Sequence, residues 1–122
     1  MEEVKSDYLG SCHCEKVRFK INTSSILEGL YKCNCSLCTK KSIIMKPVIG
    51  NSFFLIKGKE SLSLYQWNKN IAEHYFCQNC GIYTHHRRRR DPSQISVNFA
   101  CLDIAETVST LSVGIADGKS HD

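Results

Sequence analysis

The sequence predicts an all-β domain, because apolar residues recur in short alternating segments that are separated by turn residues. Residues 17–22 (VRFKIN) and 62–67 (LSLYQW) alternate apolar and polar side chains, as strands with one buried face do. Residues 52–57 (SFFLIK) are aromatic and aliphatic, and residues 94–100 (QISVNFA) predict a further strand. No long amphipathic helical pattern runs through the sequence, so we expect many short strands in one domain.

The connections between these strands are also predictable. Residues 68–70 (NKN) are expected to form a hairpin turn, because asparagine tolerates a positive φ, and the next strand then covers residues 71–77. Short helical turns are expected at residues 36–41 and 102–107. We expect residues 1–122 to form a single domain, with the tail from about residue 112 its least ordered part.

Composition excludes several classes of protein. The chain has 122 residues, of which 42% are hydrophobic and 23% charged, as in an ordinary globular domain. No apolar run approaches the ~20 residues of a membrane span, and the opening residues are acidic where a secretory signal is basic and then apolar. We therefore expect a cytoplasmic protein without a membrane partner, in which eight cysteines indicate metal binding rather than disulfides.

The positive charge of the chain is local. The net charge is +4, and the arginine run at residues 87–90 contributes four positive charges. A nucleic-acid binder spreads its lysines and arginines over a face, so this distribution does not favour DNA or RNA as the partner.

Three cysteine motifs predict zinc sites. Cys77-x-x-Cys80 followed by Gly81 is typical of a zinc knuckle, in which the glycine supplies a positive φ. A structural zinc ion needs four ligands, so the knuckle requires a second pair of cysteines. Cys12-x-Cys14 is one candidate, because residues i and i+2 of an extended segment point to the same side.

The other candidate is Cys33-x-Cys35-x-x-Cys38, which offers three sulfurs. If the two pairs form a closed four-thiolate site, these three cysteines are left as an open site, as catalytic zinc requires. Alternatively, Cys101 or His85 closes the second site and makes it structural, although Cys101 by itself is typical of a buried core thiol.

The segments GSCHCEKVRF, CNCSLC, FCQNCGIYTHHRRR and VNFACLD together resemble the glutathione-dependent formaldehyde-activating enzyme family. The resemblance implies a β-tent fold with two zinc ions and carbon-sulfur lyase activity on S-hydroxymethyl glutathione or a related thiol adduct. It implies a structural zinc ion and a labile zinc ion at which the thiol adduct binds. The structural ligands would be Cys12, Cys14, Cys77 and Cys80, and the catalytic ligands Cys33, Cys35 and Cys38.

The arginine run has both a functional and a purely structural interpretation. Because Asp91 and Pro92 follow it, it could be a solvated loop. Alternatively, a strand leaving Cys80 carries it past the second metal, so that Arg87, Arg88 and His85 bind the carboxylates of the substrate. Phosphate contact with nucleic acid is a third possibility.

The remaining candidate residues have either a catalytic or a structural interpretation. The candidates for moving the hydroxyl proton of the adduct are His85, His86 and Asp103. His74 is expected to be a hydrogen-bonded wall residue, and Trp67 to pack in the core or on the sheet. Three functions remain open at this point: a zinc lyase, a zinc module that binds nucleic acid, and a non-catalytic β-tent protein that binds another protein.

Overall fold

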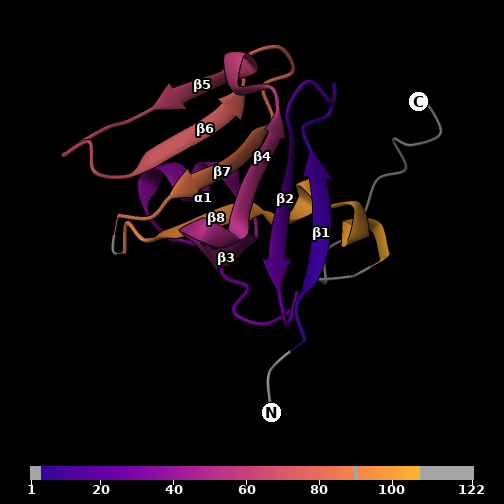
Figure 1. Cartoon of the computed structure of the whole chain (residues 1–122). Helices are drawn as coiled ribbons and strands as arrows, with labels where there is room; N and C mark the ends of the chain where they lie inside the picture. Colours follow the sequence, from indigo (N-terminus) through magenta and orange to yellow (C-terminus); the bar gives the residue numbers. More distant parts are fainter. Residues whose placement is uncertain (1–3, 90, 108–122) are drawn as a thin grey trace.

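Two antiparallel sheets form the protein in the computed structural model, which describes residues 4–89 and 91–107 (Figure 1). One sheet has three strands in the order β1-β2-β4, and the other has five in the order β3-β8-β7-β6-β5. The strands are β1 (Ser6–Ser11), β2 (Arg18–Thr23), β3 (Met45–Ile49), β4 (Phe53–Lys57), β5 (Leu62–Tyr65), β6 (Glu73–Cys77), β7 (Tyr83–Arg87) and β8 (Gln94–Asn98). The prediction of an all-β fold class is confirmed.

The helical segments are short. The single α-helix of the described residues, α1 (Ser36–Lys41), coincides with the first predicted helical turn. Short 3-10 helices are η1 (Gly50–Ser52), η2 (Lys59–Ser61), η3 (Phe99–Cys101) and η4 (Asp103–Thr107), of which η4 corresponds to the second predicted turn. No helix within residues 4–89 and 91–107 is long and apolar enough to cross a membrane.

The main core lies between the two sheets. Phe19 and Ile21 alternate along β2 and are completely buried, while Val97 of β8 is buried opposite them. Burying a side chain of this size stabilises the folded state by ~1.5–3 kcal/mol relative to leaving it in water. The period of two that predicted β2 from the sequence therefore marks the residues that join the sheets.

The predicted strands occur with shifted ends. The hairpin turn expected at residues 68–70 joins β5 to β6, and both Asn68 and Asn70 have a positive φ. The structure adds β1 and β3, which the alternation did not predict, and places β7 directly after the knuckle. The tail from residue 112 lies outside the described residues.

Candidate metal centres and active site

Four sulfur atoms lie within 4.8 Å of one another where the two sheets meet, and a metal ion could be held there. They belong to Cys12, Cys14, Cys77 and Cys80. The sulfur of Cys14 lies 3.6 Å from that of Cys12 and 3.7 Å from that of Cys77. Four sulfurs at this spacing match the donor set of a closed structural zinc site.

Local backbone geometry gathers these sulfurs. Glu15 has a φ of 64°, and the Cys12 amide donates a hydrogen bond to the Val17 carbonyl, so the chain turns tightly after β1. Gly81 has a φ of 80° and donates its amide to the Cys77 carbonyl over 2.8 Å. Apart from Gly81 and its chain neighbours, no atom of the described residues lies within 4 Å of a Cβ built on Gly81, so the backbone conformation rather than space favours glycine here.

A second group of sulfurs, those of Cys33, Cys35 and Cys38, lies at the start of α1, also within 4.8 Å of one another. Cys35 is the N-cap of the helix, and its sulfur accepts a hydrogen bond from the Cys38 amide over 3.3 Å. Burial opposes ionisation of Cys35, but this amide and the neighbouring thiols lower its pKa below the usual value. The thiolate form that binds metal is thereby favoured.

Neither sequence-based candidate for a fourth ligand joins this group. Among the described residues, no histidine, aspartate, glutamate or further cysteine lies with the three sulfurs in a common cluster. Cys101 is buried in the main core, and its sulfur lies 3.5 Å from the Tyr83 carbonyl oxygen. Within residues 4–89 and 91–107, the three-sulfur group therefore has three candidate ligands and an open coordination position.

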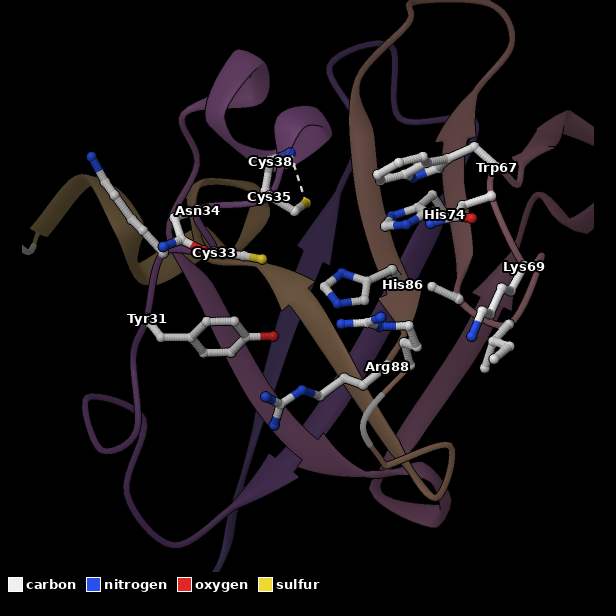
Figure 2. Close-up of a pocket in the computed structure, with 15 residues that line it drawn as sticks. Tyr31, Cys33, Asn34, Cys35, Cys38, Trp67, Lys69, His74, His86 and Arg88 are labelled. Carbon is white, nitrogen blue, oxygen red and sulfur yellow. Dashed lines mark hydrogen bonds between the residues drawn. The ribbon is translucent and has the colours of Figure 1, made fainter.

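A cavity of about 510 Å³ adjoins the three-sulfur group. Figure 2 shows Cys33, Cys35 and Cys38 on one side of this cavity and His74 and His86 on the opposite side. Arg88 extends toward Tyr31. The other lining residues are Tyr31, Lys32, Asn34, Trp67, Asn68, Lys69, Ile71, Ala72 and Arg89. A molecule bound through sulfur at the open position would thus extend into a space with basic side chains.

Two histidines form the wall that faces the sulfurs. His74 of β6 and His86 of β7 are directly opposite in register, and their ring centroids lie 5.2 Å apart. His74 Nδ1 is hydrogen-bonded to the Tyr83 hydroxyl over 2.9 Å, whereas His86 Nδ1 is buried and has no hydrogen-bond partner among the described residues. Burial and neighbouring positive charges lower the pKa of His86 to about 3, so the imidazole is uncharged at neutral pH.

The arginine run is divided between two environments. Arg87 ends β7, with its Nε 3.4 Å from a Glu73 carboxylate oxygen, and it does not line the cavity. Arg88 and Arg89 do line it. Arg88 donates a hydrogen bond to Gln94 Oε1, and its guanidinium lies 4.8 Å from the centre of the Tyr31 ring. Arg90 lies outside the described residues.

His85 and Asp103 lie away from the cavity. The His85 ring packs against Tyr75 and Phe53 at centroid distances of 4.7 and 4.5 Å, and its Nδ1 is bonded to the Thr84 hydroxyl. Asp103 is exposed at the start of η4. Because successive residues of a strand point to opposite faces, His86 rather than His85 reaches the cavity.

A half-buried lysine accompanies the three-sulfur group. Lys41 ends α1, and its Nζ lies 3.3 Å from the centre of the Tyr83 ring. This Nζ is buried, and no residue in the described part of the chain forms a hydrogen bond with it. Burial lowers the pKa of Lys41 to about 8, while the charges of Cys38 and Cys35 act in the opposite direction. This ammonium group therefore lies in the electrostatic field of the thiolates.

Several lining residues could not be assigned from the sequence. Tyr31 pairs with Met45 in an isolated β-bridge, and its hydroxyl is bonded to the Ser96 hydroxyl over 2.6 Å. Trp67 was expected in packing but lies at the cavity, 37% exposed. Counting residue pairs outward from the knuckle would have placed His85 opposite His74, and a register shift between Tyr75 and Phe76 brings His86 to this position instead.

Fold and sites together define a cysteine-rich all-β protein with one closed and one open group of candidate metal ligands. Residues 7–112 match the glutathione-dependent formaldehyde-activating enzyme family, and the chain belongs to this family. It is also similar to a Rhodobacter sphaeroides protein whose crystal structure was determined as a structural-genomics target. The two are 32% identical, with a TM-score of 0.71, and the match covers 93% of this chain and 95% of the other.

Proposed function

We propose that the protein is a zinc-dependent carbon-sulfur lyase that acts on a small thiol adduct such as S-hydroxymethyl glutathione. The observation that carries this proposal is the three-sulfur group that opens onto a cavity. Membership of a family named for glutathione-dependent formaldehyde activation supports the substrate class.

The donor sets fit zinc. Cysteine sulfur is a preferred zinc ligand, and both groups consist of cysteine alone. In this proposal Cys12, Cys14, Cys77 and Cys80 hold a structural ion, and Cys33, Cys35 and Cys38 hold a labile one. A zinc ion at the open group would supply Lewis acidity that lowers the pKa of a bound thiol.

The basic residues of the cavity suit an acidic thiol. Glutathione carries two carboxylates, and Lys32, Lys69, Arg88 and Arg89 line the space beside the sulfurs. We assign Arg88 the main role, because its guanidinium is held in place by Gln94 and Tyr31. Arg87 already has Glu73 and the Pro92 carbonyl as partners, and the ring of His85 packs on the other face of the sheet.

The reaction is the reversible cleavage of the carbon–sulfur bond in the adduct R–S–CH₂–OH. The bonding electron pair leaves with sulfur as the thiolate, the hydroxyl loses its proton, and the C=O bond of formaldehyde forms. The cavity would hold the adduct with its sulfur at the three-cysteine side and its carboxylates at the basic side.

A binding function without catalysis is the second candidate, and the described arginines do not favour nucleic acid as its ligand. Arg87 is paired and Arg88 lines a cavity, whereas phosphate binding needs exposed charges along a face.

A reducing, cytoplasmic location is part of the proposal, since all eight cysteines are free thiols and lie in the described part of the chain.

Exchange NMR tests the proposal directly. Glutathione and ¹³C-formaldehyde equilibrate with S-hydroxymethyl glutathione, and the exchange rate is measured with and without zinc-loaded protein. We expect catalytic amounts of the protein to accelerate the exchange, and Cys38→Ser to lose the acceleration. An unchanged exchange rate with fully loaded wild-type protein would contradict the lyase assignment.

A further inference from the structure

We propose that His86 is the catalytic residue that exchanges a proton with the hydroxyl of the bound adduct, through its unpaired Nδ1 atom. This inference rests on the proposed function and adds the group that completes its chemistry. Its basis is geometric, since His86 is 7% exposed, lines the cavity, and lies across from the three sulfurs in Figure 2.

An unpaired Nδ1 is unusual for a buried side chain. Most buried polar atoms have a hydrogen-bond partner, and leaving one without costs ~1–3 kcal/mol. The neighbouring His74 satisfies its own Nδ1 with the Tyr83 hydroxyl. A ligand hydroxyl in the cavity would satisfy His86 in the same way, with Nδ1 as the acceptor in the tautomer that carries its proton on Nε2.

Elimination among the described lining residues leads to the same atom. They include no aspartate or glutamate. Lysine, arginine and tryptophan side chains offer only donors at neutral pH, and the amide oxygens of Asn34 and Asn68 are not basic. The Tyr31 hydroxyl is bonded to Ser96, and the three cysteines are assigned to the metal. Of the two lining histidines, His74 has its Nδ1 bonded to the Tyr83 hydroxyl, whereas His86 Nδ1 is buried without a partner among the described residues.

The proton balance of the step is simple. As the carbon–sulfur bond breaks, its electron pair goes to sulfur, the O–H proton moves to His86 Nδ1, and formaldehyde is released. The imidazolium that forms faces a newly formed thiolate, and this ion pair offsets the burial that otherwise disfavours a charged ring. In the reverse direction, the imidazolium returns the proton to the oxygen while the thiolate adds to the aldehyde.

Two substitutions separate proton transfer from simple hydrogen bonding. His86→Asn keeps an acceptor oxygen near the position of Nδ1 but cannot take the proton, whereas His86→Leu removes both properties. We expect His86→Asn to lower kcat roughly 100-fold with little change in KM, as loss of a general acid–base group does. His13→Asn, which changes an exposed histidine outside the cavity, should keep the wild-type rate, and all variants are compared at equal zinc content.

The control for a folding failure uses wild-type protein. With ¹⁵N-histidine labelling, the His86 Nδ1 resonance should shift when glutathione and formaldehyde are added together, and not with S-methyl glutathione, which has no hydroxyl. Accelerated exchange by the wild type with an equal rate for His86→Asn, or the same shift with both ligands, would overturn this inference and leave the lyase assignment standing. Failure of the zinc-loaded wild type to accelerate exchange would overturn both.

Discussion

The sulfur of Cys14 lies 3.7 Å from the sulfur of Cys77, although 63 positions separate the two residues in the sequence. Cys14 follows β1 of the three-stranded sheet, and Cys77 ends β6 of the five-stranded sheet. A metal ion held at this point would join the two sheets, and its binding energy would contribute to folding.

The first prediction concerns the four-sulfur group that Cys14 and Cys77 belong to. Cys77→Ser should lower zinc content by one ion per chain and lower Tm by roughly 10 °C, because loss of a structural ligand costs several kcal/mol. Cys101→Ser is the matched control, since it changes a buried thiol that belongs to neither sulfur group. Metal analysis and calorimetry measure both effects, and an unchanged Tm and zinc content for Cys77→Ser would contradict a structural site.

The second prediction concerns Lys41. A zinc ion bound by three thiolates has a net charge of −1, and the unpaired ammonium group on α1 offsets it. Lys41→Met should weaken zinc binding at the three-cysteine group roughly tenfold, about 1.4 kcal/mol. Lys40→Met removes an exposed charge from the same turn and should have little effect. Chelator competition measures the affinities, and equal values for the two variants would refute the charge-balancing role.

The third prediction concerns pH. Burial lowers the pKa of His85 to about 4, below the usual 6.5. Between these values the unfolded chain binds a proton that the folded protein does not, so the contribution of His85 to stability is present above pH 6.5 and is lost as the pH falls. His85→Phe should reduce the pH dependence of the unfolding free energy by up to about 1.4 kcal/mol per pH unit. Urea unfolding of zinc-loaded protein between pH 7 and 5.5 tests this, and identical slopes would contradict it.

The fourth prediction concerns the basic side of the cavity. Arg88→Ala should raise KM for S-hydroxymethyl glutathione roughly tenfold, because a charge-assisted hydrogen bond contributes ~1.5 kcal/mol. The uncharged adduct of 2-mercaptoethanol should show little change. Arg87→Ala is the comparison variant, because its guanidinium is already paired with Glu73. An equal rise in KM for both adducts would argue against carboxylate binding.

Local sequence patterns predicted the strands whose side chains alternate between core and surface. Phe19 and Ile21 show why, since they are buried while Lys20 between them is not. The alternation did not predict β3, which contains Pro47. A proline is tolerated there because β3 is an edge strand with β8 as its neighbour, and this position depends on the whole sheet.

The candidate site was predictable to a similar extent. Cysteine spacing predicted the three motifs, because short turns bring the cysteines of one motif together. The meeting of Cys12 and Cys14 with Cys77 and Cys80 depends on how the two sheets pack. The cavity wall was not predictable in the same way. Whether Arg87 or Arg88 lines it depends on where β7 ends, and Trp67 reaches it through the course of the β5–β6 connection.

The coordination of the metal at Cys33, Cys35 and Cys38 tests the account most directly. X-ray absorption of wild-type protein and Cys77→Ser, with and without glutathione, separates the two candidate sites. We predict two zinc ions per wild-type chain and a thiol-dependent gain of one sulfur at the three-cysteine group, while Cys38→Ser loses that ion and keeps the fold. A second zinc ion that already has four protein ligands, and that no added thiol changes, would contradict the account and indicate a purely structural site.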